Sequence, residues 1–303
     1  MIETTASCAI ARADWSAYLG DDLMVLLCQS DVPVASVEVL ARLDAPAHIS
    51  AAFCLQLADG SLLKARRALS AARAAQISYF LHYLKGDVFP AVHAVHKAGL
   101  LLEWVTGAAL GSPAGEQHVR ASGRLQGQLH LEPTPHDCPY AVELDLQGMS
   151  ARMEQSLSNL CECGALLAQE ARAITQLARR SRPGEASTGI IHTDLCPDNL
   201  VASPDGVLRP VDNESLQIGY LDLDLARTWY RWPLAAESGA AFLAEYDHFR
   251  SSSEFRGHFP FWFTFVLLES ARYRIGSASR AWELPVARLR AFMRNPRADM
   301  LDV

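Results

Sequence analysis

The sequence predicts an α+β protein in which a small, β-rich N-terminal lobe precedes a larger, mainly helical C-terminal lobe. Alternating runs and hairpin turns fill the first hundred residues. Helical spacing dominates the remainder, and no repeat or low-complexity linker interrupts the chain. The change in character lies near residues 103–107, so we expect lobes at 1–104 and 105–303 with a ligand-binding cleft between them.

The N-terminal lobe shows roughly five strands around a helix. Apolar residues recur at helical spacing in two segments, and Ala58-Asp59-Gly60 is a hairpin turn signal between alternating runs. The expected elements, in order, are a helix over 12–28, a strand over 36–43, a hairpin of 52–57 and 61–65, a helix over 70–84, and a hairpin of 91–96 and 100–105.

The C-terminal lobe is predicted to be helical except for one polar segment. That segment, 190–212, has the pattern of a strand, a loop and a second strand, with a turn at 203–206. The helices are expected over 118–131, 153–180, 235–250, 261–274 and 285–294.

Composition limits the classes of function. The chain has 303 residues and a net charge of -7, which argues against a nucleic-acid binder. An acidic surface suits a cationic small substrate, although acidic solvated surfaces are common. The seven cysteines are scattered without zinc-site spacing, which favours reduced thiols. No secretion signal or membrane-length apolar stretch is found, so we expect a cytoplasmic protein that contacts no membrane.

The segment "IIHTDLCPDNLVASPDGVLRPVDNE", residues 190–214, concentrates chemistry-bearing side chains. Phosphoryl transfer needs a carboxylate beside the acceptor hydroxyl and a few hard oxygen ligands for magnesium. Asp194 is the candidate base. Asn199 and Asp212 are the candidate metal ligands, because the turn between them would bring two strand ends together. His192 is more simply explained as a structural hydrogen-bonding group.

The spacing His192-x-Asp194-x-x-x-x-Asn199, followed by Asp212, resembles the catalytic and metal loops of the aminoglycoside phosphotransferase family. That family shares the protein-kinase-like fold, and choline, fructosamine and homoserine kinases have related patterns. Three further stretches resemble its motifs: LLEWVTG at 101–107, LQGQLH at 125–130 and DLDLAR at 222–227. In order, the matches cover roughly residues 36–234.

The resemblance implies a nucleotide site with ATP, or alternatively GTP, and Mg²⁺. Backbone groups of the hinge at Glu103 and Val105 would hold the adenine, so the Glu103 side chain itself would matter little. Lys64 stands where the family keeps its phosphate-binding lysine, and Ser50 with nearby amides could also contact phosphate. Asp224 would brace the catalytic loop, with a helix N-cap as the alternative reading.

Three departures from the family pattern stand out. Gln76 occupies the helix position where a Glu would pair with Lys64, and a Gln lacks that charge. The loop 43–50 contains no glycine. Asp212-Asn213-Glu214 replaces the Asp-Phe-Gly of protein kinases, which points away from that class.

The sequence therefore predicts a small-molecule kinase that phosphorylates a hydroxyl group; the alternative is a nucleotide-binding pseudokinase acting as scaffold or sensor. The family suggests an aminoglycoside or other antibiotic as acceptor, with resistance as the role, and equally admits an amino alcohol, sugar or nucleoside. The oligomeric state stays open. Aromatic and acidic residues of the C-terminal helices are candidates for an acceptor site, with core packing and solvation as the plainer explanation: Trp229, Tyr230, Trp232, Glu237, Glu245, Asp247, Trp262, Glu269 and Trp282.

Overall fold

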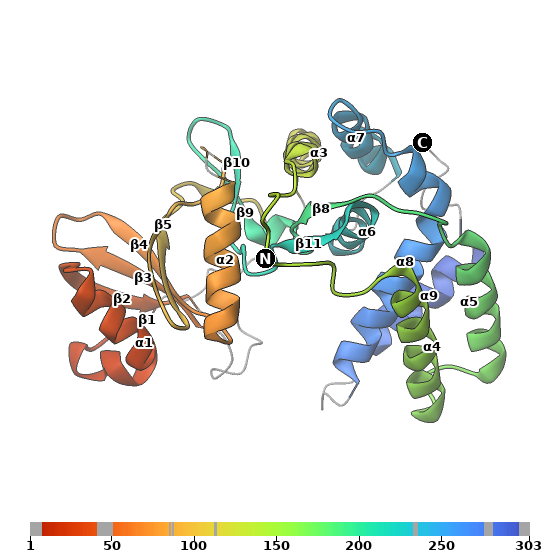
Figure 1. Ribbon diagram of the computed structural model, residues 1–303, viewed down its shortest axis with the longest axis horizontal. Helices are drawn as coiled ribbons and strands as arrows, with labels where there is room; N and C mark the ends of the chain where they lie inside the picture. Colours follow the sequence, from red (N-terminus) through yellow and green to blue (C-terminus); the bar gives the residue numbers. More distant parts are fainter. Residues whose placement is uncertain are drawn as a thin grey trace. The chain divides into compact units, whose positions relative to one another are not determined.

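The computed structural model describes residues 8–40, 51–84, 86, 88–111, 114–232, 236–275 and 281–296 (Figure 1). The chain forms two compact units. Unit 1 comprises Met1–Pro113 and Asp198–Leu216, and unit 2 comprises Ala114–Pro197 and Gln217–Val303. Unit 1 thus includes Asp198–Leu216, which comes from the polar segment of the sequence and not from its N-terminal third. The predicted division of the chain into functional lobes at 1–104 and 105–303 stays a prediction.

Unit 1 is built on a six-stranded antiparallel sheet in the order β1-β2-β3-β4-β6-β5. The predicted hairpins are confirmed, because alternation and turn residues agree at each. The short strand β1 was not predicted, since three residues carry no readable period. The strands are β1 (Cys8–Ile10), β2 (Val34–Val39), β3 (Ala51–Leu57), β4 (Leu62–Arg67), β5 (Val92–His96) and β6 (Gly99–Glu103).

Within the described residues, two helices accompany this sheet, in agreement with those expected over 12–28 and 70–84. The 3₁₀ turn η1 (Arg12–Asp14) leads into α1 (Trp15–Gln29), which bends at Gly20 with φ 75°. Leu19 and Leu23 of α1 pack with Phe53 in a fully buried core. Helix α2 (Ala71–Tyr83) begins after Ser70, whose hydroxyl accepts the N–H of Arg73 at 3.2 Å.

A three-stranded sheet in the order β10-β9-β7 completes unit 1. It joins β7 (Ala108–Ala109) to the hairpin of β9 (Leu200–Ala202) and β10 (Leu208–Pro210). Gly107 enters β7 with φ 152°, and a Cβ there would lie 2.2 Å from the Ala202 carbonyl oxygen. Only glycine therefore allows β7 to approach β9 this closely.

Unit 2 contains the two-stranded antiparallel sheet of β8 (Thr188–Ile191) and β11 (Gln217–Tyr220), surrounded by helices. Strand β11 and helix α6 were not predicted. In Figure 1, α6 lies beside this sheet. The helices are α3 (Glu116–Leu131), α4 (Leu146–Glu162), α5 (Ala168–Ser181), α6 (Leu221–Arg231), α7 (Ala236–Asp247), α8 (Ser253–Arg274) and α9 (Glu283–Arg294).

Two predicted helices of unit 2 differ from those observed. The single helix expected over 153–180 is wrong: α4 ends at Glu162, and Gly164 turns the chain with φ 73° before α5. Helix α8 begins at Ser253, earlier than expected, and continues through Pro260. Its buried aromatic side chains, including Phe259 and Trp262, form much of the core of this unit.

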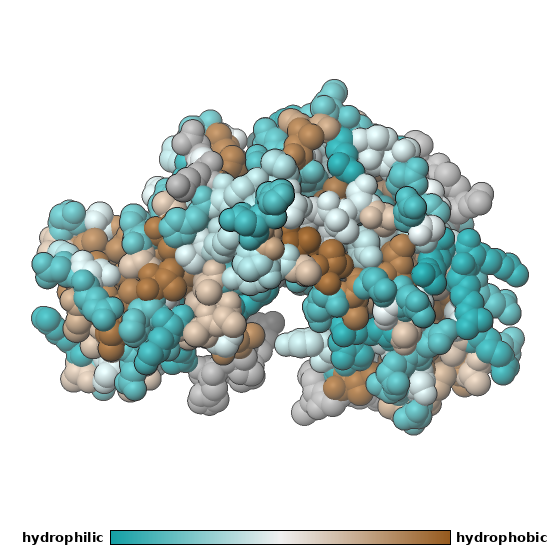
Figure 2. Space-filling view, in the orientation of Figure 1, coloured by the Kyte–Doolittle hydropathy of each residue, from teal (hydrophilic) through white to brown (hydrophobic). Residues whose placement is uncertain are grey.

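The outer surface of helix α5 in unit 2 is polar. Only Ile174 and Ala178 of α5 are buried, and the outer side of this helix, at the right of Figure 2, is hydrophilic. None of the helices in the described residues is both long enough and apolar enough to cross a membrane. The described cysteines form no disulfide.

Candidate active site

One face of helix α6 holds the loop that follows β8. Asp224, Arg227 and Arg231 recur at helical spacing on α6, and each contacts a residue of 192–196. The indole N–H of Trp232, next to the helix end, donates to the Leu195 carbonyl at 3.0 Å. The loop with the candidate base is thus fixed from outside along most of its length.

Thr193 has an unusual backbone conformation directly before the candidate base. Its φ is 58°, which a β-branched residue rarely adopts. Asp224 accepts its N–H at 2.5 Å, while Arg227 Nε donates to its carbonyl at 2.9 Å. Both ends of this residue are therefore held. Strain of this kind, of order 1–3 kcal/mol, persists where the surroundings enforce it.

Asp224 is the buried centre of this arrangement. It also accepts the N–H of His192 at 3.1 Å and lies 3.0 Å from Nε2 of His130, whose Nδ1 lies 2.9 Å from the Tyr246 hydroxyl. Burial raises the pKa of Asp224, but the hydrogen bond and charge of His130, together with smaller contributions from Gln126 and His192, outweigh it, and the net pKa is lowered. Since α6 begins three residues earlier, the N-cap reading of Asp224 is wrong.

Asp194 lies between cations of α6. Its Oδ1 is 2.8 Å from Arg231 Nε. Burial lowers the pKa of Arg227, and the charge of Asp194 partly opposes that lowering. Arg231 and Arg227 therefore place positive charge beside the carboxylate of the candidate base. Sequence reasoning missed Arg231, although its seven-residue spacing from Asp224 was readable.

The candidate metal ligands come together within unit 1. The N–H of Val211 donates to the Asn199 carbonyl at 2.9 Å, which extends the β9–β10 ladder by one pair. Asp212 therefore follows directly after the backbone partner of Asn199. Asn199 is buried, whereas the Asp212 side chain retains 14% exposure. The predicted turn between them produces this neighbourhood.

Arg66 is a component of the site that sequence reasoning missed. This buried side chain on β4 lies 2.9 Å from Asp212 Oδ1 and also contacts Glu214. Lys64, two residues earlier on the same face of β4, donates to the Val211 carbonyl. The period-2 relation to Lys64 was the signal in the sequence that could have identified Arg66.

Gln76 of α2 has hydrogen-bond partners at both ends of its side-chain amide. Its Nε2 donates to the Leu216 carbonyl at 3.2 Å, and its Oε1 accepts from Arg73 at 2.7 Å. The residue therefore ties α2 to the segment after Asp212. Glu214, which lies in that same segment, forms an ion pair with Arg66 of β4.

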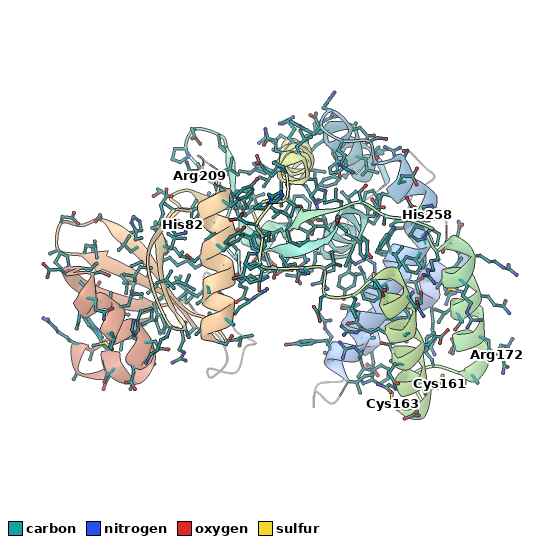
Figure 3. All side chains as sticks on the ribbon, in the orientation of Figure 1. His82, Cys161, Cys163, Arg172, Arg209 and His258 are labelled. Carbon is teal, nitrogen blue, oxygen red and sulfur yellow. The ribbon has the colours of Figure 1, made fainter. Side chains whose placement is uncertain are left out.

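The predicted adenine-binding residues end strand β6. The Glu103 side chain accepts the Ala91 N–H at 2.9 Å and pairs at 3.2 Å with Arg209 of β10, a residue labelled in Figure 3. The side chain of Glu103 therefore has a structural role of its own. Val105 is buried two residues later. Ser50, predicted to contact phosphate, lies outside the described residues.

The donor set of unit 1 fits magnesium. Asn199 and Asp212 provide amide and carboxylate oxygens, the hard donors this ion prefers. Within the described residues no group of three or more His, Cys, Asp or Glu could hold a metal by itself. A magnesium ion held here would therefore depend on water and nucleotide phosphates for its remaining ligands, as is usual in phosphoryl transfer.

Solved structures with the same fold include three of direct interest. A macrolide 2'-phosphotransferase type I is 12% identical, with 93% of this chain and 98% of that chain covered and a TM-score of 0.66. A choline kinase from Streptococcus pneumoniae is 15% identical over 88% and 95%, with a TM-score of 0.64. An ethanolamine kinase from Plasmodium vivax is 11% identical over 87% and 84%, with a TM-score of 0.63.

These similarities show a protein-kinase-like fold and confirm the predicted fold class. A comparison with curated protein sequences finds no match. A family model described as "Phosphotransferase enzyme family" matches residues 38–258, which include Lys64, the polar segment and helix α6. With most of its length matched by that model, the chain belongs to the phosphotransferase enzyme family.

Proposed function

We propose that the protein is a kinase that transfers the γ-phosphoryl group of ATP to a hydroxyl of a small molecule. The observation that carries the proposal is the fixation of Asp194 by helix α6, through Arg231 at 2.8 Å and the two hydrogen bonds on Thr193. A carboxylate held in place in this way is suited to orient an acceptor hydroxyl.

Asp194 would accept the proton of the acceptor hydroxyl as its oxygen forms a bond to the γ-phosphorus. The bond from that phosphorus to the β–γ bridging oxygen breaks, and ADP leaves. Asn199 and Asp212 would hold Mg²⁺, which neutralises charge on the phosphates when bound. Lys64 would contact the α- and β-phosphates, and the backbone at Glu103 and Val105 would contact the adenine. Use of GTP is an open alternative.

The acceptor stays a proposal at the level of a hydroxylated small molecule, and antibiotics are one class among several. The named activities of the similar structures cover macrolide, choline and ethanolamine acceptors. A cytoplasmic location and the absence of nucleic-acid or membrane partners likewise stay predictions.

The test is phosphorylation of pooled compounds by the purified protein with MgATP. The pools contain aminoglycosides, macrolides, nucleosides, amino alcohols and sugars, and mass spectrometry detects the gain of one phosphoryl group. Asp194→Ala should lose the product. Asp205→Ala, at an exposed turn, is the matched control and should keep it. Nucleotide binding without any phosphorylated product would contradict the kinase and favour the pseudokinase.

A further inference from the structure

Unit 2 contains a cavity of about 260 Å³ beside the catalytic loop. Thr193, the residue before Asp194, lines it together with Arg227 of α6. The other walls come from the segment before α4 and from α4, β8, β11 and α8. The position next to Thr193 makes this cavity the natural place for a molecule that reacts at Asp194.

Most of the cavity wall is apolar. Leu144, Ile191, Leu223 and Phe265 contribute side chains from four different elements. The volume is below the usual range of pockets for drug-sized ligands, which begins near ~300 Å³. A ligand that fills the cavity is therefore compact and places a hydrophobic body against these walls.

The acidic side chains at the cavity already have cationic partners. Glu269 lies 2.8 Å from Arg272 and 3.7 Å from Arg152, and its side chain is only 17% exposed. Glu143 lies 3.9 Å from Arg152 and is mostly exposed. Among the described lining residues, Glu143 and Glu269 are balanced by Arg152 and Arg227. The cavity therefore carries no surplus of negative charge.

Two acidic residues elsewhere in the C-terminal helices also have cationic partners. Glu245 pairs with Arg120 and Arg124, and Asp247 pairs with Arg256. Of the acids that the sequence suggested for an acceptor site, only Glu269 lines the cavity. A polycation bound here would lose its hydration without gaining compensating carboxylates, which is strongly unfavourable.

We propose that this cavity is the acceptor site and that it takes a compact alcohol with a hydrophobic body and no polycationic character. The hydroxyl would point to the Thr193–Asp194 side, and the hydrophobic body would contact Leu144 and Leu223. That the ligand receives a phosphoryl group rests on the proposed kinase activity. The chemical class of the ligand follows from the residues that line the cavity. Of the cationic substrates considered from the sequence, the proposal excludes those with several positive charges.

Binding is tested first, without nucleotide. Ligand-observed NMR on the full chain compares a panel of neutral aryl and alicyclic alcohols with polycationic aminocyclitols of similar hydroxyl content. We expect neutral alcohols to bind and Leu144→Trp or Leu223→Phe, which fill the cavity from two walls, to weaken binding at least about tenfold. Arg179→Gln, on the exposed side of α5, is the matched control and should leave binding unchanged.

A charge variant sharpens the test. Arg152→Gln with Arg272→Gln removes both cationic partners of Glu269 and should improve binding of a monocationic amino alcohol about tenfold or more. Tighter binding of polycations than of neutral alcohols to the unmodified protein would overturn the proposal. Failure of every neutral alcohol to bind at about 1 mM would do the same.

Phosphotransfer is then measured separately with MgATP and the compounds that bind. Transfer to a neutral alcohol, reduced by Leu144→Trp, supports both the cavity assignment and the kinase. Binding that is sensitive to Leu144→Trp, but without transfer to any bound compound, leaves the ligand class standing and contradicts the proposed kinase. Transfer that is insensitive to both cavity-filling variants overturns the acceptor assignment and leaves the kinase intact.

Discussion

The carboxylate of Asp224 accepts the backbone N–H of Thr193 at 2.5 Å, and this contact joins helix α6 to the catalytic loop. The same carboxylate is held by His130 from α3, 94 positions away in sequence. The buried side chain of Asp224 thus connects helices α3 and α6 to Thr193, the residue before Asp194. Four predictions test this arrangement and the neighbouring contacts.

Asp224→Asn should lower both activity and stability. The variant's amide places a donor where His130 or the backbone N–H groups also donate, and it removes a buried charge whose partners remain. We expect unfolding free energy to fall by about 3 kcal/mol and turnover to fall at least about tenfold. Urea unfolding and phosphotransfer rates check this; unchanged turnover in folded protein would refute the bracing role.

Asp222→Asn, two residues earlier on the same helix, should have the opposite effect on stability. Burial raises the pKa of Asp222 from 3.8 to about 6, with His130 and His258 partly opposing. The native state therefore binds more protons than the unfolded state between about pH 4 and 6, and stability falls as pH rises through that window.

At pH 7 to 8 the Asn variant should be more stable by ~1–3 kcal/mol, because it removes the cost of ionising a buried carboxyl. Thermal unfolding from pH 4 to 8 measures this difference. A gain that is equally large at pH 4, or no gain at pH 8, would be inconsistent with the raised pKa.

Arg66→Met should expose the competition between this arginine and a metal for Asp212. Two partly buried carboxylates would lose their cation, so stability should fall by about 2–4 kcal/mol. Mn²⁺ should then bind more tightly, by about tenfold, and restore part of the loss. Titration calorimetry and thermal unfolding with Mn²⁺ provide the readouts.

The double variant Arg66→Met with Glu214→Gln is the control for that experiment. Removing both partners relieves the uncompensated charge, so the double variant should be less destabilised than the sum of the two single variants. Strict additivity would mean that the Arg66–Glu214 contact contributes nothing in solution.

Gln76→Glu should not create a stronger nucleotide site. The side-chain N–H to the Leu216 carbonyl is lost, and a carboxylate there faces that carbonyl oxygen. We expect a loss of about 1 kcal/mol in stability and no tighter binding of MgATP, measured by calorimetry. Markedly tighter MgATP binding would show instead that an acidic side chain at position 76 strengthens the nucleotide site.

The sequence was informative where residues close together in the chain determine the structure or the site. Asp194, Asn199 and Asp212 could be proposed because loop spacing and a turn fix their relation, and the hairpins of unit 1 because alternation and turn residues coincide. These residues' catalytic and metal-binding roles stay predictions until the variants are measured.

Contacts that span the chain could not be read in this way. Arg66 meets Asp212 across 146 positions, and the left-handed φ of Thr193 depends on two side chains from α6. The break at Gly164 was missed because helical spacing continues on both sides of it. Short elements such as β1 and β11 carry too few residues to show a period.

The most direct test of the account is the turnover of Asp194→Asn with a compound phosphorylated in the pooled screen. This variant keeps the size of the side chain and removes its ability to accept the proton. The account predicts a fall in kcat of about 10²–10⁴-fold with nucleotide affinity nearly unchanged. Wild-type turnover in Asp194→Asn would contradict the central claim that Asp194 is the residue that serves the acceptor hydroxyl.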